Sequence, residues 1–312
     1  MVSCYEAEPR GFCAGVDRAI AIVEKALEKF GAPIYVRHEI VHNRWVVESL
    51  RNKGARFVQE LSDVPDGATV IYSAHGVSKA VSQEGKDRPL QVLDATCPLV
   101  GKVHREAERL DREGRRVILI GHKGHPEVEG TVGQLAPGKI EVLSRIQEVE
   151  QIQLHSNEKM AFITQTTLSL DETAEVVSAL KKKFPDIQEP SREDICYATQ
   201  NRQNAVKALV EKCDLVLVIG APNSSNSNRL REVAERGGVP AHLIESADDI
   251  DLSWFEGVSC LGVTAGASAP EILITGLLDF LGERVESVEL LSITEENLIF
   301  PLPRLLQDHL EP

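Results

Sequence analysis

Residues 215–219 of the sequence read LVLVI, an apolar run with the length of a β-strand. A strand with one solvated face alternates apolar and polar side chains, whereas a strand covered on both faces is apolar throughout. Comparable runs occur at residues 34–36, 69–72, 117–120, 160–163 and 260–263. We therefore expect buried strands that lie in parallel sheets between helices.

Stretches with the periodicity of amphipathic helices lie between these runs, at residues 16–30, 99–113, 171–184 and 201–213. Strands that alternate with helices along a chain are typical of α/β proteins with largely parallel sheets. A chain of 312 residues is also long enough for more than one such unit, since domains commonly hold about 100–200 residues. The expected fold class is α/β.

Three cysteines recur in similar settings along the chain. Cys13, Cys97 and Cys196 each follow an extended stretch and precede a helical one, and successive members are separated by the length of a small α/β unit. We expect three similar small lobes with mostly parallel sheets around a shared centre. Their expected boundaries are residues 1–96, 97–193 and 194–312.

The charged residues exclude some classes of partner. The chain has 34 Lys and Arg against 48 Asp and Glu, a formal net charge of −14. A chain this acidic has no excess cationic field to displace phosphate counterions, so we expect no nucleic-acid partner. No apolar run approaches the length of a transmembrane helix, and the first residues lack the features of a signal peptide. We expect no membrane partner and a cytoplasmic location.

Cysteines at the starts of helices are suited to binding a soft metal, because the helix dipole and unpaired N–H groups stabilise the thiolate. Three such thiolates would bind Zn²⁺ or an iron–sulfur cluster, and a [4Fe–4S] cluster held by three would keep one iron open. The alternative is three buried apolar cysteines. That core role is expected for Cys4, Cys213 and Cys260, which fall in strand-like or helical stretches.

Histidines stand where loops are expected to follow strands. His42 follows a strand-like stretch, His75 ends a predicted strand, and His125 precedes a helix. Ligands of open α/β sheets bind at the carboxyl ends of strands, so these three are candidate ligand-binding residues. His122 with His125 would alternatively supply half of a zinc site. The remaining histidines are expected to be surface or structural residues: His38, His104, His155, His242 and His309.

The polar run at residues 223–228 (NSSNSN) lies between the strand at 215–219 and a predicted helix. Hydroxyls, amides and unpaired N–H groups at a helix N-terminus bind anions without cationic side chains. The alternative is an ordinary N-cap with turn residues, but the run is long for that role. The sequence favours phosphate binding there, and Ser268 repeats the theme.

Glu127 is the best candidate for a proton donor, because it stands in the first turn of the helix that follows His125. A carboxylate at that position is also a common partner of the helix dipole, which favours the ionised form. Burial or a nearby anionic ligand would have to raise the pKa of Glu127 for it to carry protons at neutral pH.

Together these motifs resemble the family of 4-hydroxy-3-methylbut-2-enyl diphosphate reductases, which catalyse the last step of the non-mevalonate isoprenoid pathway. The resemblance covers nearly the whole chain, with the motifs in one order. The matching segments are residues 10–16 (RGFCAGV), 39–43 (EIVHN), 73–78 (SAHGVS), 94–98 (DATCP), 124–130 (GHPEVEG), 164–169 (TQTTLS), 196–199 (CYAT), 223–230 (NSSNSNRL) and 266–270 (GASAP). Gly101 and Pro222 depart from the family pattern, in which we expect Thr and Lys.

The resemblance implies a trefoil of three α/β lobes around a central [4Fe–4S] cluster, which Cys13, Cys97 and Cys196 hold with one iron left open. It implies that Glu127 carries protons to the substrate hydroxyl and that Thr166, or its neighbour Thr167, helps to position this group. The residues implied to hold the diphosphate are His42, His75, His125, Ser224, Ser225, Asn226 and Ser268.

The implied reaction is the reductive dehydration of (E)-4-hydroxy-3-methylbut-2-enyl diphosphate, a small allylic diphosphate, to isopentenyl diphosphate and dimethylallyl diphosphate. Two electrons and two protons enter, and water leaves. The electrons would come from ferredoxin or flavodoxin, because the chain has no flavin or nicotinamide motif of its own. The alternatives are a non-redox iron–sulfur dehydratase and a cluster-binding sensor with a pocket for a phosphate ligand.

Overall fold

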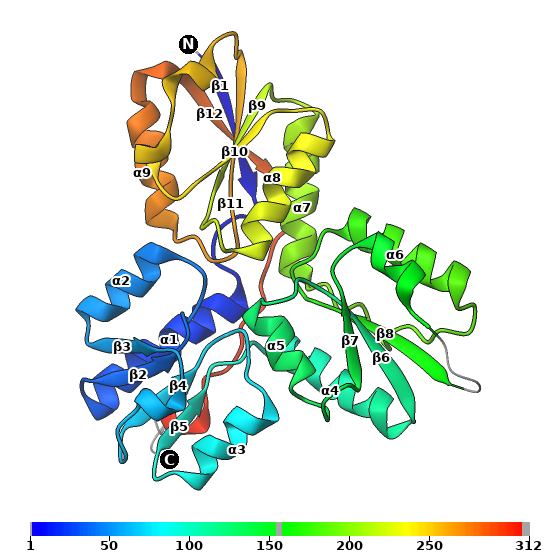
Figure 1. Cartoon of the computed structure of the whole chain (residues 1–312). Helices are drawn as coiled ribbons and strands as arrows, with labels where there is room; N and C mark the ends of the chain where they lie inside the picture. The colour runs from blue at the N-terminus through cyan, green and yellow to red at the C-terminus, as the bar shows by residue number, and fades with distance from the viewer. Residues whose placement is uncertain (1, 154–157, 308–312) are drawn as a thin grey trace. The chain divides into compact units, whose positions relative to one another are not determined.

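The computed structural model describes residues 2–153 and 158–307 (Figure 1). Its strands form three sheets, and the strand pairs within them are parallel. The chain divides into two compact units. The first comprises Met1–Val16, His42–Val46 and Tyr197–Ile299, and the second comprises Asp17–Val41, Val47–Cys196 and Phe300–Pro312.

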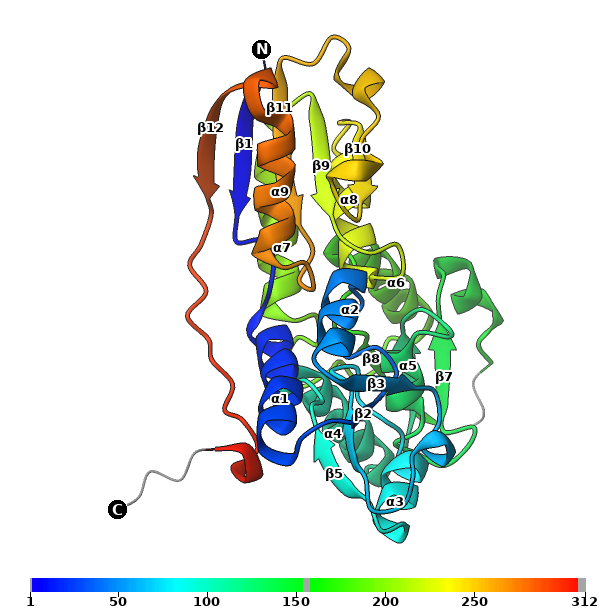
Figure 2. The same cartoon turned by 90° about the vertical axis from the view of Figure 1, so that its left-hand side faces the viewer.

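The first unit holds a five-stranded sheet in the order β10-β9-β11-β1-β12 (Figure 2). Its strands are β10 (Ala241–Ile244), β9 (Leu215–Ile219), β11 (Cys260–Ala265), β1 (Val2–Glu8) and β12 (Val285–Ser292). Helices α7 (Tyr197–Val210) and α8 (Ser225–Arg236) cover one face of this sheet, and α9 (Glu271–Leu281) covers the other.

Strand β9 shows why the run LVLVI becomes a central strand. Leu215, Leu217 and Ile219 pack in the same core cluster as α9, whereas Val216 and Val218 pack with α7 and α8. Each of these five side chains is at most 2 % exposed. Burial of a Val, Leu or Ile side chain contributes roughly 1.5–3 kcal/mol relative to leaving it exposed. A polar substitution at any position of β9 would therefore weaken the packing on one face or the other.

The second unit holds two sheets, in the orders β3-β2-β4-β5 and β7-β6-β8. The strands are β3 (Ala55–Val58), β2 (Ile34–Arg37), β4 (Thr69–Tyr72), β5 (Gln91–Asp94), β7 (Ile140–Leu143), β6 (Arg115–Ile120) and β8 (Lys159–Thr164). The helices are α1 (Ala14–Phe30), α2 (Arg44–Asn52), α3 (Lys79–Asp87), α4 (Pro98–Arg112), α5 (Pro126–Val132) and α6 (Leu170–Lys183), of which α1 and α2 begin in the first unit.

Strand β6 repeats the pattern of β9 in the second unit. Val117 and Leu119 pack with α4 and α5, whereas Ile118 and Ile120 pack with α6. The fold class is thus confirmed as α/β with three parallel-sheet lobes, and each of the six predicted strands is present.

Helix α7 begins at Tyr197, earlier than the predicted start near residue 201. Hydrophobic periodicity does not reveal the first turn, because the residues that α7 buries include Thr199, Arg202 and Gln203. A helix with a polar buried stripe has a weak amphipathic pattern.

The structure differs from the expected lobe boundaries at the N-terminus. Strand β1 pairs with β11 and β12 in the sheet of the first unit, and not with the strands that lie between residues 34 and 94. Residues 1–96 therefore do not form one lobe, and residues 194–312 are joined by β1. Parallel strands are connected through long crossovers, so the partner of β1 is not encoded in its local pattern.

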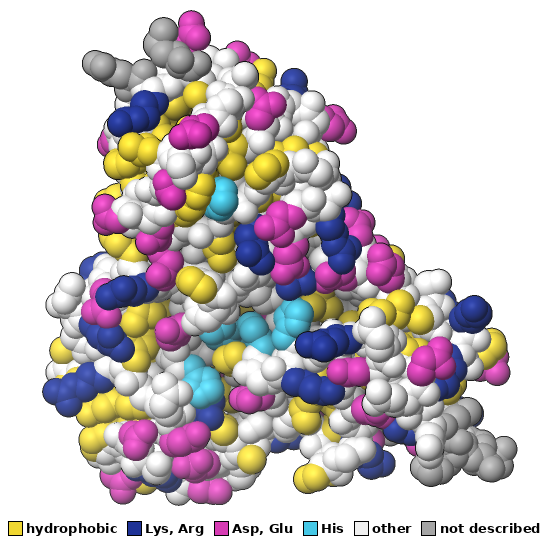
Figure 3. Space-filling view, turned by 45° about the horizontal axis from the view of Figure 1, so that its top comes forward, with side chains coloured by type: hydrophobic (Ala, Val, Ile, Leu, Met, Phe, Trp, Pro, Cys, Tyr) yellow, Lys and Arg dark blue, Asp and Glu magenta, His cyan; other side chains and the backbone are white. Residues whose placement is uncertain are grey.

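Acidic and basic side chains are interspersed over the face of the molecule seen in Figure 3. Among residues 2–153 and 158–307, no helix combines the length and the apolar character needed to cross a membrane.

Candidate functional site

The three cysteines of the predicted cluster stand at the starts of helices, as expected. Cys13 directly precedes α1, Cys196 directly precedes α7, and Cys97 is the N-cap residue of α4. Their side chains are all partly exposed. A thiolate at such a position is favoured by the positive end of the helix dipole.

The backbone around each cysteine repeats one hydrogen bond. The cysteine N–H donates to the carbonyl of the residue two positions beyond the end of a neighbouring strand. These acceptors are Ala267 after β11 for Cys13 (3.3 Å), Ala74 after β4 for Cys97 (3.0 Å) and Thr166 after β8 for Cys196 (3.0 Å). The residues that follow the acceptors, Ser268, His75 and Thr167, therefore occupy equivalent local positions. This repeated bond is the structural form of the similarity seen in the sequence.

A buried arginine holds the chain just before Cys13. Arg202 on α7 is fully buried, and its guanidinium donates to the carbonyls of Gly11 (2.8 Å) and Phe12 (3.1 Å). Glu296 lies 3.1 Å away and balances its charge. An unpaired charge in the interior is costly, so these partners are required for burial. The arrangement fixes the backbone from which the Cys13 side chain extends.

Arg18 on α1 has a similar role before Cys97. Its guanidinium donates to the Thr96 carbonyl at 3.1 Å. The Thr96 N–H in turn donates to the Asp94 carboxylate at 2.8 Å, which closes a tight turn at the end of β5. The segment that leads into α4 is thus held from both sides.

Asp194 anchors the chain before Cys196. Its buried carboxylate accepts from the Thr164 N–H (3.1 Å) and pairs with the Lys102 ammonium of α4 (3.2 Å). Burial raises the pKa of Asp194, and the hydrogen bond and the Lys102 charge oppose that rise. The pairing ties the Cys196 segment to α4, the helix that Cys97 begins.

The polar run before α8 is built around Ser224 and Ser227. The Ser224 Oγ is the N-cap group and accepts from the Ser227 N–H (3.3 Å) and from the Ser227 hydroxyl (3.0 Å). A Cβ on Gly220 or on Gly266 would lie 2.1 or 2.0 Å from the Ser227 Oγ. The two glycines therefore allow the N-terminus of α8 to approach the ends of β9 and β11.

Ser225 and Asn226 lie in the first turn of α8. The Asn226 Oδ1 accepts from the Ala267 N–H at 2.9 Å. Its Nδ2 is buried and has no hydrogen-bond partner in the part of the chain that the structure describes. Leaving a buried donor unsatisfied costs about 1–3 kcal/mol. Asn226 is therefore placed to donate to a ligand that carries acceptor oxygens.

His42 and Ser268 are joined by a hydrogen bond in which the Ser268 hydroxyl donates to the His42 carbonyl (2.8 Å). The His42 Nδ1 lies 3.2 Å from the Asn223 Nδ2. An amide nitrogen only donates, so a neutral His42 ring carries its proton on Nε2. The predicted site residues of the first unit thus gather around the loop at residues 266–268, to which Cys13 and Asn226 also bond.

Glu127 and Thr166 form a buried pair in the second unit. Glu127 lies in the first turn of α5 and is 3 % exposed. The Thr166 N–H donates to its Oε1 (2.7 Å), and the Thr166 hydroxyl donates to its Oε2 (3.0 Å). Burial raises the pKa of Glu127 from 4.5 to about 7, against the two hydrogen bonds, and the Asp194 carboxylate adds to the rise. The group is therefore able to take up and release a proton near neutral pH.

His125 lies next to this pair, and His75 contacts His125. His125 caps α5, and its Nδ1 accepts from the Glu127 N–H at 3.1 Å, so a neutral His125 ring carries its proton on Nε2. The two imidazoles meet edge to face with their centroids 5.7 Å apart. The His75 Nδ1 lies 3.2 Å from the Ser73 Oγ.

The loop that carries His75 is held between two helices. Gly76 has a φ of 81°, and a Cβ there would lie 2.8 Å from the His104 ring of α4. A Cβ on Gly130 of α5 would lie 3.3 Å from the Gly76 carbonyl group. Burial lowers the pKa of His104 to about 4, so this ring packs in its neutral form. Of the histidines expected to be surface or structural, His155 and His309 lie outside the described residues.

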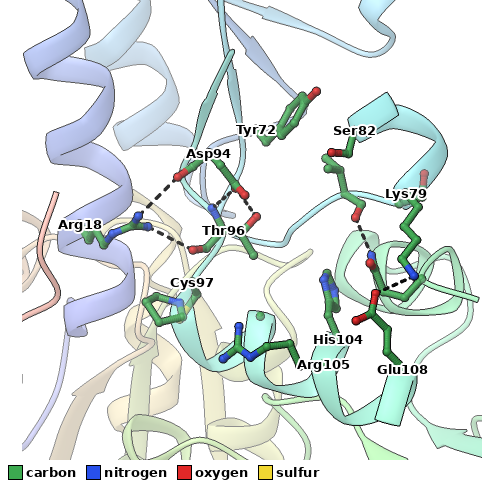
Figure 4. Close-up of a pocket in the computed structure, with 15 residues that line it drawn as sticks. Arg18, Tyr72, Lys79, Ser82, Asp94, Thr96, Cys97, His104, Arg105 and Glu108 are labelled. Atoms are coloured by element: carbon green, nitrogen blue, oxygen red, sulfur yellow. Dashed lines mark hydrogen bonds and ion pairs between the residues drawn. The ribbon is translucent and has the colours of Figure 1, made fainter. Parts of the chain in front are cut away.

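A cavity of about 430 Å³ opens beside Cys97 in the second unit (Figure 4). Its wall includes Cys97, the N-cap residue of α4, and Gly101, His104 and Arg105 of that helix. A Cβ on Gly101 would approach the Arg105 guanidinium to 3.3 Å. The departure from the expected Thr at this position therefore leaves the cavity wider.

The other three cysteines lie in the first unit. Cys4 is 1 % exposed, and burial raises its pKa to about 12. Cys213 is 5 % exposed, and burial raises its pKa strongly. Both have the predicted core role, whereas Cys260 at the start of β11 is partly exposed. All six cysteines lie among the described residues, and none of them is in a disulfide.

Three supporting residues have no motif of their own: Arg202, Asp194 and Lys102. Arg202 could have been found from its spacing, because it lies on the same helical stripe as Ala198 and Ala205. A charged residue on such a buried stripe needs a buried partner. Asp194 shortly precedes Cys196, as Asp94 precedes Cys97, and this recurrence is visible in the sequence. Nothing in the sequence marks Lys102 as the partner of Asp194.

Within residues 2–153 and 158–307, no three His, Cys, Asp or Glu side chains are placed to hold one metal ion. Cys13 belongs to the first unit, and Cys97 and Cys196 belong to the second. The three share a local setting, and their role as ligands stays a prediction.

A family model described as LytB protein matches residues 4–282. The chain belongs to the LytB protein family. The 4-hydroxy-3-methylbut-2-enyl diphosphate reductase of Magnetococcus marinus is 67 % identical over 302 residues, which cover 97 % of this chain and 98 % of that protein. The reductase of the same name from Actinobacillus succinogenes is 58 % identical over 304 residues, or 96 % of this chain and 97 % of that protein.

Two solved structures of diphosphate reductases are also similar to this chain. The E-1-hydroxy-2-methyl-but-2-enyl-4-diphosphate reductase from Plasmodium falciparum has a TM-score of 0.95 at 39 % identity, and covers 98 % of this chain and 96 % of that chain. An (E)-4-hydroxy-3-methyl-but-2-enyl diphosphate reductase, described as the terminal enzyme of the non-mevalonate pathway, has a TM-score of 0.65 at 34 % identity, with 91 % and 100 % covered. The family resemblance seen in the sequence is confirmed.

Proposed function

We infer that this chain is an oxidoreductase that converts (E)-4-hydroxy-3-methylbut-2-enyl diphosphate to isopentenyl diphosphate and dimethylallyl diphosphate, the last step of the non-mevalonate pathway. The observation that carries this conclusion is the 67 % identity, over 97 % of the chain, to a reductase of that name. In the reaction the allylic carbon–oxygen bond breaks, two electrons and two protons enter, and the hydroxyl group leaves as water.

We propose that Cys13, Cys97 and Cys196 hold a [4Fe–4S] cluster. The donor set fits, because the three thiols are partly exposed and stand at helix starts that favour thiolates. Cys4 and Cys213 fit poorly, since burial raises the pKa of each and disfavours its thiolate. When bound, the cluster would supply electrons and a Lewis-acidic iron.

The residues proposed to hold the diphosphate are mostly neutral donors: His42, His75, His125, Ser224, Ser225, Asn226 and Ser268. The buried Asn226 Nδ2, which has no partner among the described residues, supports this assignment most directly. His42 and His125 support it as well, because their Nδ1 contacts place the proton of each neutral ring on Nε2, which is then a donor nitrogen. The N-terminus of α8 adds backbone N–H groups that suit a phosphate.

Glu127 is proposed to deliver protons to the substrate, first to the leaving hydroxyl group. Its raised pKa makes the protonated form available near neutral pH. Thr166 donates both its N–H and its hydroxyl to Glu127, so its proposed role is to orient the carboxyl group. Thr167, which occupies the position equivalent to His75 and Ser268, is the better candidate to face the ligand.

The electron donor is proposed to be ferredoxin or flavodoxin, since the reaction consumes two electrons and the sequence has no flavin or nicotinamide motif. A cytoplasmic location is likewise a proposal.

The test is an anaerobic assay of the cluster-loaded protein with reduced viologen as electron donor and with product detection by mass spectrometry. Glu127→Gln should lower kcat by about 10²–10⁴-fold, because a positioned proton donor contributes that much. Glu129→Gln on the same helix is the matched control, since Glu129 is exposed, and its kcat should match the wild type.

Three results would contradict this scheme. Equal rates for the two variants would remove Glu127 from proton transfer. Turnover that does not require a reductant would identify a non-redox dehydratase. Tight diphosphate binding without turnover would identify a sensor.

A further inference from the structure

Two thiols that the proposed reaction does not use lie in contact in the first unit. Cys213 is in the connection between α7 and β9, and Cys260 is the first residue of β11. Their sulfur atoms are 3.6 Å apart, with the Cys260 thiol donating to the Cys213 sulfur. The contact joins two neighbouring parallel strands at the ends where both begin.

The backbone keeps these two residues together. The Asp214 N–H donates to the Cys260 carbonyl at 2.8 Å, and the Asp214 carboxylate accepts from the N–H groups of Ser259 and Cys260, each at 2.9 Å. These hydrogen bonds, one to a backbone carbonyl and two to the Asp214 carboxylate, hold the two segments together and leave little freedom for the sulfur atoms to separate. The pair is therefore preorganised by the sheet.

The two thiols differ in access. Cys213 is 5 % exposed and packs with Leu209 and Val216 in the core, whereas Cys260 is partly exposed. A reagent in solution reaches Cys260 first, and the buried partner is then within reach of the modified sulfur. This division is typical of an attacking thiol and a resolving thiol.

We propose that Cys213 and Cys260 are a redox modification site, which forms a reversible disulfide by exchange with a low-molecular-weight disulfide. The Cys260 thiolate attacks one sulfur of the small disulfide, so that a mixed disulfide forms and one small thiol leaves. Cys213 then loses its proton and attacks the Cys260 sulfur, which releases the second small thiol. The protein loses two electrons and two protons, and one small disulfide is reduced to two thiols. The final bond requires the sulfur atoms to approach to about 2.0 Å.

Burial affects the second step of this exchange. It raises the pKa of the Cys213 thiol and makes its thiolate scarce, so resolution is slower than the first attack. The mixed disulfide on Cys260 should therefore be detectable at early times.

The disulfide would close a covalent loop that contains the polar run before α8. The two cysteines are 47 positions apart, and strand β9, the run at residues 223–228 and α8 all lie between them. The pair stands at the N-terminal ends of β9 and β11, whereas the run and Ser268 follow the C-terminal ends. The bond would brace this part of the sheet without using any thiol proposed for the cluster.

The experiment is anaerobic incubation of cluster-loaded protein with glutathione disulfide, followed by alkylation, proteolysis and mass spectrometry. The expected product is a peptide pair joined through Cys213 and Cys260 that dithiothreitol separates. The visible absorbance of the cluster should be retained, and the thermal midpoint should rise by several degrees, as expected for a cross-link across a long loop. This readout does not depend on catalytic activity, so it stands apart from the proposed reaction.

Three variants test the order of the steps. In Cys213→Ser, Cys260 should accumulate as the glutathione adduct, and in Cys260→Ser no adduct should form on Cys213. Cys4→Ser is the matched control, since Cys4 is a buried thiol on the neighbouring strand β1, and it should give the wild-type cross-link. An unmodified Cys260 in the wild type, or a cross-link from Cys260 to any other cysteine, would overturn the proposal.

Discussion

The two units contribute different kinds of candidate site residue. In the first unit, most of those that are proposed to bind the diphosphate carry hydroxyl or amide groups, and His42 is the exception. In the second unit, they include the imidazoles of His75 and His125 and the buried carboxyl group of Glu127. Ser224, Asn226 and Ser268 do not titrate in the neutral range. Glu127, by contrast, has a pKa raised to about 7 by its burial. The hydroxyl and amide groups of the first unit are suited to binding a charged ligand, whereas Glu127 of the second unit is suited to moving protons. Binding and proton transfer should therefore respond to different changes.

The largest expected effect is on the pH dependence of kcat, which should follow the protonation of Glu127. Above pH 7 the protonated fraction of Glu127 falls, and kcat should fall toward a tenfold loss per pH unit. Thr166→Val removes a hydroxyl donor that favours the ionised form, so the pKa should rise and the decline should move to higher pH. Thr131→Val is the control, because the Thr131 hydroxyl donates to the Glu127 backbone carbonyl and not to its carboxyl group. A decline at the same pH in all three proteins would contradict the assignment.

The same titration should appear in stability. The folded-state pKa of Glu127 is raised from 4.5 to about 7, so its protonated form contributes stability that is complete below pH 4.5. That contribution is lost as the pH rises through 7, and it amounts to about 3 kcal/mol. Urea unfolding should show that the free energy of unfolding of the wild type falls by about 3 kcal/mol relative to that of Glu127→Gln as the pH rises from 4.5 to above 7. A difference that stays constant with pH would show that Glu127 does not titrate there.

A substitution in the first unit should change the KM for the diphosphate substrate and leave the pH dependence of kcat unchanged. Asn226→Asp keeps the oxygen that accepts from the Ala267 N–H and replaces the unsatisfied donor by an acidic group. The KM for the diphosphate substrate should rise about 10–100-fold, since a hydrogen bond to a charged group is worth about 1.5–3 kcal/mol. Asn204→Asp adds the same charge at an exposed position of α7 and should leave KM unchanged. A shift in the pH dependence of kcat without a change in KM would break the contrast.

The smallest effect concerns the packing that places α8. Gly266→Ala should lower the free energy of unfolding by about 1–3 kcal/mol, because the added Cβ would lie 2.0 Å from the Ser227 Oγ. In a Ser227→Ala background this cost should shrink, since the clashing oxygen is absent. Equal costs in both backgrounds, measured by denaturant unfolding, would show that Ser227 is not the limiting contact.

The parts of the site that stand at helix starts could be predicted from the sequence, and its long-range contacts could not. The cysteines, His125 and the polar run stand at helix starts, and helix starts follow from local signals such as Pro98 and the Asn and Ser residues before α8. The Arg202 and Lys102 contacts were not visible, because they join segments that are remote along the chain.

The sequence by itself determined the α/β class, the six predicted strands and the residue types available for metal and phosphate chemistry. Apolar runs such as that of β9 suffice for this, because a strand buried on both faces needs an apolar side chain at every position. Only the tertiary structure decided that β1 joins the sheet of β11 and β12 and that Glu127 has a raised pKa. Strand partners and the loss of solvent around a carboxyl group both depend on segments far away in the chain, and no local pattern records them.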